Sequence, residues 1–362
     1  MSASEAMPVP AARPVPSSRL PGTRPWATLG GVLVLVVMAS LAIGTVSVPP
    51  LAILGSLWEA LGLGEASQRL EPMQRAVLLS VRLPRVVLGV MVGAVLATTG
   101  AALQALFRNP LVEPGLLGTS SGAALGAVLA IVLDVTLGAH LGGLRMLMVP
   151  GTAFCGALGA TLLAQRLGMG GGRTDTPRML LAGVAVSSGA FAGMGLLTYA
   201  ATDAQLRSIT FWSLGSLGGA SWETVGAATV PLLLTLGLLL REARALNLML
   251  LGEREAWHLG VDVERLKRRL ILSAALGVGA AVAFTGMIGF VGLLVPALLR
   301  MALGPDHRRL LAASALCGAS LLLAADLLSR TLAAPSELPV GALTSVLGVP
   351  AFIALLARKG AA

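Results

Sequence analysis

Charged residues are scarce in this 362-residue sequence, in which Asp, Glu, Lys and Arg together make up 12% and hydrophobic residues 56%. Soluble domains carry about 25% charged residues. A soluble fold of this size would need a polar coat, which 26 Lys+Arg and 17 Asp+Glu do not supply. The mean hydropathy of +0.85 is likewise that of a predominantly apolar chain. The composition therefore indicates a membrane protein that lies in the lipid bilayer, and excludes a cytosolic enzyme, a nucleic-acid-binding protein and a disordered chain.

Lysine and cysteine are nearly absent. Only Lys267 and Lys359 are lysines, so the formal charge of +9 comes from arginine. In polytopic membrane proteins an excess of arginine marks the cytoplasmic loops, and it does not require a nucleic-acid partner. Cys155 and Cys317 lie inside apolar runs. We expect both to be small buried hydrophobic residues rather than a disulfide or a metal pair.

Long apolar runs divide the chain into about ten spans, because a hydrocarbon layer takes roughly 20 helical residues. Almost no polar residue separates the two runs that meet near Gly286. The prediction is an all-α polytopic membrane protein with spans at residues 27–47, 86–106, 115–134, 146–165, 178–200, 223–240, 269–287, 288–303, 310–331 and 340–357.

The first apolar run follows a proline-rich stretch. Residues 1–26 contain six prolines and are predicted to be a disordered cytoplasmic tail. The run 27–47 is longer than the roughly 7–15 apolar residues of a signal peptide, so we interpret it as the first span. Residues 27–358 then form a single transmembrane domain, and 359–362 form a cytoplasmic tail.

The distribution of basic residues predicts the orientation. With ten spans both termini share a side, and placing them in the cytoplasm leaves 19 of the 26 basic residues on that side. The outer side keeps seven, namely Arg69, Arg75, Arg82, Arg85, Arg145, Arg207 and Arg330.

Two ways of driving transport find little support within the chain. A phosphate-binding P-loop requires Gly before its lysine, whereas Leu266 precedes Lys267 and Arg358 precedes Lys359. Ion coupling usually uses carboxylates or histidines at membrane depth. Asp326 is a candidate, but Arg330 follows it one helical turn later and an ion pair is the simpler account. A self-contained ion-coupled carrier that uses Asp326 stays open as an alternative.

Residues 118–122, Gly-Thr-Ser-Ser-Gly, match the Gly-x-Ser-x-Gly elbow of serine hydrolases. That elbow joins a strand to a helix, whereas this segment opens an apolar helix, with no histidine within the span to act as a base. Small residues at a helix start are the preferred interpretation. An intramembrane hydrolase that uses Ser120 is the second alternative.

Two polar stretches are unusual. Residues 241–269 alternate apolar anchors with charges, which predicts a helical pair too polar to span the membrane, with an apolar stripe that offers a docking edge. A solvated loop is the alternative there. The second stretch is Ser80–Arg85, where Arg82 and Arg85 on the outer side run against the orientation rule. They would either bind carboxylates of an extracytoplasmic partner or reach to lipid phosphates.

A short internal similarity links two apolar spans. Residues 92–100 read VGAVLATTG and residues 278–286 read VGAAVAFTG. Copies that begin five spans apart would have opposite orientations, and inverted repeats are typical of transporters. Chance similarity in a chain rich in Gly, Ala and Val is the alternative. Pairs such as Gly89 and Gly93 fit close helix packing.

Three separated segments, Ser80–Ala127, Leu250–Val261 and Leu322–Leu356, resemble the FecCD-type permeases of ABC importers for ferric siderophores, haem and cobalamin. The resemblance covers most of residues 70–358. It implies a BtuC-like fold with ten helices per subunit, a homodimer with the path at its axis, and a place in the bacterial inner membrane. It also implies two separate cytoplasmic ATPase subunits that use ATP and Mg, so this chain is expected to be a transport subunit rather than an enzyme.

The same resemblance implies site residues. Within a coupling loop at about 242–266, the expected contacts to the ATPase are Leu251, Gly252, Glu253, Ala256, Leu259 and Gly260. Arg82, Arg85 and Arg330 are the expected contacts to a periplasmic substrate-binding protein. No catalytic, cofactor or metal site is expected in this chain.

The expected cargo is a whole chelate, because carboxylate-poor spans offer few of the oxygen and imidazole ligands that a bare metal ion prefers. The Phe211–Gly219 stretch is most similar to haem permeases, so haem is favoured. A ferric siderophore or cobalamin is the alternative within the family.

Overall fold

The computed structural model describes residues 24–60, 70–141, 147–171 and 173–360. Seven helices in this part of the chain are long and apolar enough to cross a membrane, and three shorter apolar helices accompany them. Their positions correspond to the ten predicted spans. The bounds are α1 (Arg24–Ala42), α4 (Leu83–Leu106), α5 (Thr119–Leu141), α6 (Met148–Leu167), α7 (Thr176–Tyr199), α9 (Trp222–Arg241), α12 (Val263–Thr285), α13 (Val291–Leu303), α14 (His307–Thr331) and α15 (Val340–Gly360).

Short elements connect these helices. They are α2 (Pro50–Ala60), α3 (Pro72–Val77), the π-turn η1 (Leu78–Arg82), the 3₁₀ turn η2 (Pro114–Leu117), α8 (Asp203–Leu214), α10 (Ala243–Met249), α11 (Glu253–His258) and the antiparallel hairpin β1 (Met169–Gly170) and β2 (Arg173–Thr174). The helical pair predicted within residues 241–269 is confirmed by α10 and α11. Residues 263–266, the last of the predicted coupling loop, lie in the first turn of α12.

The helix before residue 86 is the largest departure from the predicted spans. The chain is helical without interruption from Pro72 to Leu106, so Arg82 and Arg85 lie within a helix and not in a loop before it. Pro84 has no N–H to donate to the preceding turn. The widened turn η1 accommodates it, and the N–H of Leu83 donates to the carbonyl of Leu78 five residues back.

The break near Gly286 is where the sequence places it. Gly286, the C-cap of α12, has φ +69°, and Phe290, the N-cap of α13, has φ +67°. A residue with positive φ cannot continue a right-handed helix, so the two apolar runs become separate helices.

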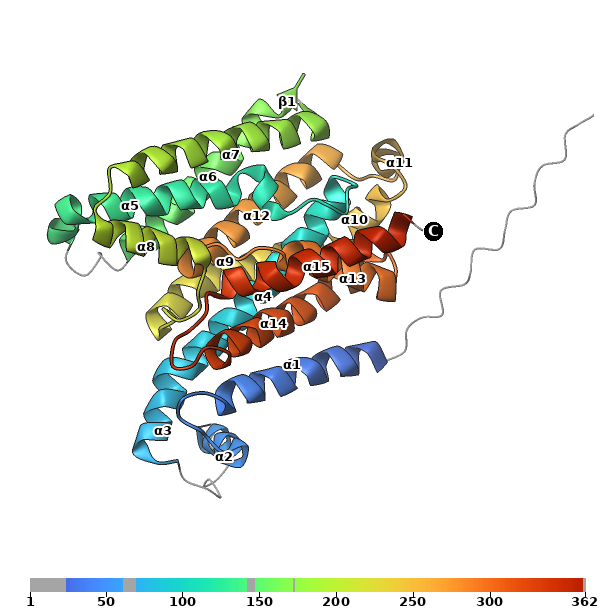
Figure 1. Cartoon of the computed structure of the whole chain (residues 1–362). Helices are drawn as coiled ribbons and strands as arrows, with labels where there is room; N and C mark the ends of the chain where they lie inside the picture. The colour runs from blue at the N-terminus through green and yellow to red at the C-terminus, as the bar shows by residue number, and fades with distance from the viewer. Residues whose placement is uncertain (1–23, 61–69, 142–146, 172, 361–362) are drawn as a thin grey trace, which may run out of the picture.

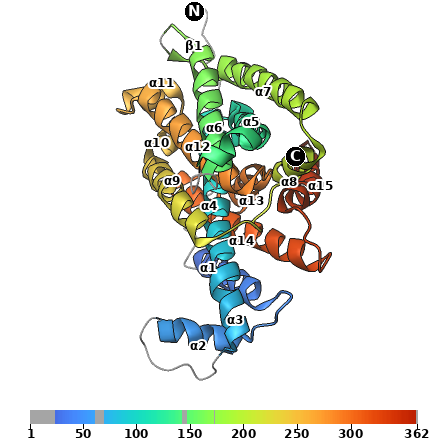
Figure 2. The same ribbon diagram turned by 90° about the vertical axis from the view of Figure 1, so that its left-hand side faces the viewer.

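The helices form one bundle with two distinct ends (Figure 1). One end, called here the α11 end, holds α10, α11, β1, the start of α1 and the end of α15. The opposite end, called the α3 end, holds α2 and α3, which Figure 2 also places away from β1 and α11. The two described termini therefore share an end with the α10–α11 segment. Residues 1–23, the bulk of the predicted tail, lie outside the described residues.

The helix α4 lies at the centre of the bundle, where it contacts α9, α12, α13 and α14. Glycines allow the closest of these approaches. A Cβ on Gly100 would overlap the backbone of Gly292 at the start of α13, and one on Gly93 would overlap the backbone of Gly318 on α14. Dispersion contact between backbones replaces side-chain packing at these crossings, which is how helices associate in lipid.

The nine-residue similarity corresponds to a structural relationship. The end of α4 and the start of α12 both lie at the α11 end, so the two helices run in opposite directions (Figure 1). Each of these helices packs on helices that follow the other one in the sequence. The helix α4 packs on α13 and α14, which follow α12, and α12 packs on α5 and α6, which follow α4. Gly93 lies against Gly318 on α14, and the corresponding Gly279 lies against Ala157 on α6. This is the packing expected of an inverted repeat.

The prediction for the cysteines is wrong for one of them. Cys317 is half-buried on α14, but Cys155 is exposed on α6, and both are free thiols. The outward face of a membrane helix is apolar too, so an apolar run does not distinguish a lipid-facing residue from a core residue.

Candidate functional site

The α10–α11 segment projects from the α11 end of the bundle and presents apolar side chains on its surface. Leu246, Met249 and Ala256 face inward and are fully buried. Gly252 joins the two helices with φ +133°, a conformation that favours glycine. The outward positions are more than half exposed and apolar, namely Leu250, Leu251, Trp257 and Leu259. An apolar ridge of this kind on a polar loop is typical of a protein–protein contact.

A groove of about 580 Å³ runs beside this ridge. It lies between the hairpin and the α11–α12 corner and combines both signs of charge with one indole ring. Its lining residues are Arg173, Glu253, Arg254, Trp257, Asp262, Val263 and Glu264. Among the predicted ATPase contacts, Glu253 lines the groove itself, Leu251 and Leu259 are exposed beside it, and Ala256 packs inward. Gly260 adopts φ +89° in the turn between α11 and α12.

The inner side of α11 is held by a buried lysine. Lys267 is 3% exposed, and its Nζ donates to the Thr174 carbonyl at 3.0 Å and to Glu253 Oε2 at 2.9 Å. Glu264 Oε1 lies 3.7 Å away. Glu264 Oε2 in turn accepts hydrogen bonds from the N–H and the hydroxyl of Thr174. The hairpin, α11 and α12 are thereby joined at one point.

The helix α10 is attached to different elements. Asn247 Nδ2 donates to Asp306 at 2.7 Å, and Asn247 Oδ1 accepts the His307 N–H at 2.7 Å. Arg108, just after α4, donates to the Met249 carbonyl at 3.1 Å. Burial alone would raise the pKa of Asp306, but hydrogen bonds from Asn247 and the Arg308 N–H, with Arg308 and Arg309 nearby, lower it overall. Asp306 is therefore a carboxylate that caps α14 and holds α10.

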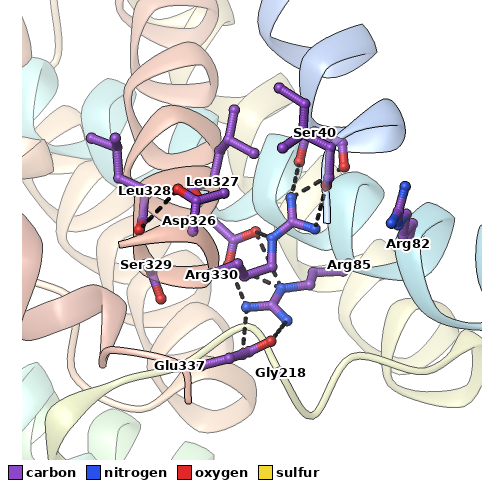
Figure 3. Close-up of polar contacts among 12 residues, drawn as sticks. Ser40, Arg82, Arg85, Gly218, Asp326, Leu327, Leu328, Ser329, Arg330 and Glu337 are labelled. Atoms are coloured by element: carbon purple, nitrogen blue, oxygen red, sulfur yellow. Dashed lines mark hydrogen bonds and ion pairs between the residues drawn. The ribbon is translucent and has the colours of Figure 1, made fainter. Parts of the chain in front are cut away.

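A buried ion network occupies the α3 end (Figure 3). Arg85 on α4 is its centre, with Nη2 2.8 Å from Asp326 Oδ1 on α14. Arg85 also binds Glu337 with both terminal nitrogens at 2.9 Å, in the bidentate geometry that suits a guanidinium. Asp326 is fully buried, whereas the side chain of Glu337 is 45% exposed. The hydrogen bonds from Arg85 lower the pKa of Glu337, which outweighs the opposing effect of partial burial.

Two further arginines tie this network to α1. Arg330 lies 3.3 Å from Asp326, one helical turn away, and donates to the carbonyl and hydroxyl of Ser40. Arg82 donates to the backbone carbonyls of Leu41 and Ala42, at the end of α1, and of Val46 in the turn that follows. The ion pair predicted between Asp326 and Arg330 is confirmed. All three arginine side chains bind groups of this same chain. The predicted loop before residue 86 gave no reason to expect these contacts.

The sequence gives no sign of the residues that bind the three arginines, Asp306 and Lys267. Ser40, Asn247, Thr174 and Glu337 carry no motif of their own, and each meets its partner across a long stretch of chain. Lys267 offered one signal, since it is one of two lysines in an arginine-rich chain. Its side chain is buried, whereas those of the neighbouring Arg265 and Arg269 are exposed.

Ser120 does not lie in a nucleophile elbow. The segment runs from the 3₁₀ turn η2 through Gly118, with φ +84°, into α5, so no strand precedes the serine in this described region. The strained strand-to-helix turn that exposes a hydrolase nucleophile is therefore missing here.

The half-buried Glu113, just before η2, lies beside the start of α13. Its Oε1 accepts the N–H of Phe290 at 3.1 Å, at the start of α13. Burial raises the pKa of Glu113, and the hydrogen bond from Phe290 opposes that rise. The carboxylate thus satisfies a donor that the helix break would leave without a partner.

Known proteins share this sequence and architecture. Residues 32–358 match the FecCD transport family. The hemin transport system permease protein HmuU of Yersinia pestis is 50% identical over 281 residues, which cover 78% of this chain and 83% of the relative. The cobalamin import system permease protein BtuC of Halobacterium salinarum is 41% identical over 332 residues, covering 90% and 85%.

A solved structure agrees with the fold. A metal-chelate-type ABC transporter in an inward-facing conformation superposes with a TM-score of 0.80 at 32% identity, covering 92% of this chain and 99% of that one. With a family match over nearly the whole chain and relatives well above 30% identity, the chain belongs to the FecCD transport family.

Proposed function

We propose that this chain is the permease subunit of an ABC importer that carries an iron chelate, with haem as the favoured cargo, across the bacterial inner membrane. The family match over residues 32–358 carries the proposal. The α10–α11 segment supports it, because it offers an apolar ridge and a charged groove for a separate protein at one end of the bundle. The chain is a transport component rather than an enzyme, and the ATP and Mg belong to two copies of a partner ATPase.

The choice of haem rests on similarity. The relative with 50% identity is a hemin permease, and the cobalamin permease is 41% identical. Apolar spans suit a planar, greasy chelate that is carried whole. A ferric siderophore or cobalamin is the alternative cargo of the same machine.

The α11 end is assigned to the cytoplasm. It holds α10 and α11 together with both described termini (Figure 1), and this orientation places 19 of the 26 basic residues on the cytoplasmic side. A second copy of the chain completes the path at a homodimer axis. A loaded periplasmic binding protein docks at the α3 end, the closing ATPase dimer moves the α10–α11 segments, and the paired bundles alternate access.

Docking of the binding protein through Arg82, Arg85 and Arg330 stays a prediction. Their guanidinium groups donate within the chain, so their contribution would be to hold Glu337 and the 41–46 turn in place at the α3 end. Arg330→Gln should raise the dissociation constant of the binding protein if this positioning matters. An unchanged dissociation constant in an Arg330→Gln variant that unfolds at the wild-type temperature would show that docking does not depend on Arg330.

The first test is reconstitution. The chain is co-purified with its ATPase in proteoliposomes, and ATP hydrolysis and haem entry are measured with and without a haem-loaded binding protein. Stimulated hydrolysis with haem entry supports the proposal. A stable complex that moves cobalamin or a siderophore instead would change the cargo, and a chain that recruits no ATPase would overturn the importer function.

The coupling role is tested by deletion. Removing residues Gly252–Gly260 takes away α11 and its flanking glycines, while α10 and α12 remain. Hydrolysis and uptake should become independent of each other. Uptake that survives the deletion would rule out coupling through this segment.

A further inference from the structure

Lys267 is a buried cation where the hairpin, α11 and α12 meet. Its side chain is 4% exposed, and a buried ammonium is costly unless each of its protons has a partner. Three oxygen atoms surround Nζ, from Thr174 at 3.0 Å, Glu253 at 2.9 Å and Glu264 at 3.7 Å. Two of these contacts are hydrogen bonds and the third is an ion pair, and a buried charge is strongly destabilising when such partners are removed.

The partners of Lys267 come from three different elements. Glu253 is the first residue of α11, Thr174 is the last residue of β2, and Glu264 lies in the first turn of α12. Glu264 also accepts from Thr174 N at 3.0 Å and from Thr174 Oγ1 at 2.9 Å. The hairpin is therefore held from both sides, and the contact from Lys267 to Glu253 is its link to α11.

The hairpin leads directly into α7. Asp175 follows Thr174 and is the N-cap of α7, with its carboxylate accepting the Arg178 N–H at 3.3 Å. A helix held at its cap moves with the residue that precedes it, because the capping geometry restrains the first turn. A displacement of Thr174 thus reaches α7 without an intervening flexible loop.

The helix α7 is free to respond. It packs against α5, α6 and η2 and has few buried residues, with Leu181 and Leu196 more than 70% exposed. It runs along one edge of the bundle (Figure 1). By contrast, α10 is bound to the α14 cap and to the end of α4 through Asn247 and Arg108. Movement of α11 would therefore be relayed to α7 through Lys267 at the start of α12 and through the hairpin.

From this geometry we infer that Lys267 is a positioning residue that transmits movement of α11 to α7 through Glu253 and Thr174. The inference deepens the proposed importer function and rests on it. The α11 movement is driven by the partner ATPase, and α7 is the helix whose tilt it sets. Loss of the link would leave ATP hydrolysis intact but separate it from transport.

The matched variants use the same helix. Lys267→Met keeps a side chain of similar length and removes its charge. Lys267→Arg keeps a cation that can donate to Thr174 and Glu253. Arg269→Gln is the control, because it removes a cation two residues away whose pair with Glu242 is 63% exposed on the arginine side. In the reconstituted complex, Lys267→Met should raise the ATP hydrolysed per molecule transported at least fivefold. Lys267→Arg and Arg269→Gln should stay within twofold of wild type.

A second readout does not require transport. Spin labels at His258 on α11 and Leu181 on α7, both exposed, are placed in a Cys155→Ser, Cys317→Ser background. Labelled permease is diluted with unlabelled permease, so that most complexes carry labels on one protomer. In the ATPase complex, with and without trapped nucleotide, double electron–electron resonance should then give one narrow distance distribution for wild type. The distribution should broaden and shift with nucleotide in Lys267→Met.

The outcomes separate the two proposals. A chain that binds its ATPase but transports nothing contradicts the importer function, and the label distances still decide whether Lys267 links α11 to α7. A wild-type ratio of ATP to cargo, or a wild-type distance distribution, in Lys267→Met overturns the inference. If Lys267→Met fails to fold, Glu253→Ala removes the acceptor of the same link at a half-exposed position and must show the same changes.

Discussion

Gly93 on α4 and Gly318 on α14 lie back to back, so that a Cβ on either one would overlap the carbonyl oxygen of the other. The crossing is therefore as close as two helix backbones allow. Gly122 on α5 and Gly156 on α6 repeat the same reciprocal contact. In a lipid environment, where apolar burial gives helices no advantage over lipid, such contacts hold the bundle together.

Gly93→Ala should destabilise the bundle by about 1–3 kcal/mol, since the obstructing atoms belong to backbone and cannot turn aside. The midpoint of thermal unfolding in detergent measures it. Gly226→Ala is the matched control on α9, where nothing lies within 4 Å of an added Cβ. Equal unfolding temperatures for the two variants would contradict the close crossing.

Asp326→Asn should cost about 3–5 kcal/mol, because it leaves buried Arg85 and Arg330 without their shared carboxylate. Arg265→Gln, which breaks an exposed pair with Asp262, should change stability by no more than about 1 kcal/mol.

Transport activity of the same Asp326→Asn variant separates a structural role from ion coupling. Complexes that fold should import at the wild-type rate per molecule, and so should complexes with Ser120→Ala. A folded Asp326→Asn complex that has lost uptake would favour the self-contained carrier.

The Glu337–Arg85 pair should make stability depend on pH. The pKa of Glu337 is lowered in the folded chain from its ordinary value near 4.5. The unfolded carboxyl binds its proton first as pH falls, so the stabilisation is complete above about pH 4.5 and is lost as pH drops through the lower, folded pKa.

The measurement compares unfolding temperatures of wild type and Glu337→Gln across this range. The difference should shrink as the pH falls below 4.5. In an Arg85→Gln background the same comparison should show no such trend, because the hydrogen bonds that lower the pKa are gone. A difference that stays constant with pH in the wild-type background would count against the pair.

Trp257→Ala should weaken binding of the partner ATPase at least about tenfold, since an exposed indole beside a charged groove has the character of an interface anchor. Affinity is read from titration of the purified ATPase onto the permease in nanodiscs. Leu51→Ala is the control, because Leu51 is equally exposed, at 66%, on α2 at the opposite end. Loss of affinity in both variants would indicate a general defect.

Hydropathy was sufficient to locate the ten apolar helices, because a span is a local property of about 20 consecutive residues. The break at Gly286 was predictable for the same reason, since a glycine between two apolar runs marks the change of direction locally. The helical pair at 243–258 followed from its alternation of apolar and charged residues. The helix start at Pro72 did not, because a polar helix that continues a span outside the lipid carries no hydropathy signal.

Residue chemistry alone established that this is a membrane chain with few buried charges, and that Arg82, Arg85, Arg330 and the α10–α11 segment differ from their surroundings. Only the tertiary structure decided what these groups touch. Arg85 meets Glu337 across 252 positions of chain, and Lys267 meets the Thr174 carbonyl across 93. Electrostatic pairing depends on distance in space and not along the sequence, so these partners become neighbours only when the helices pack.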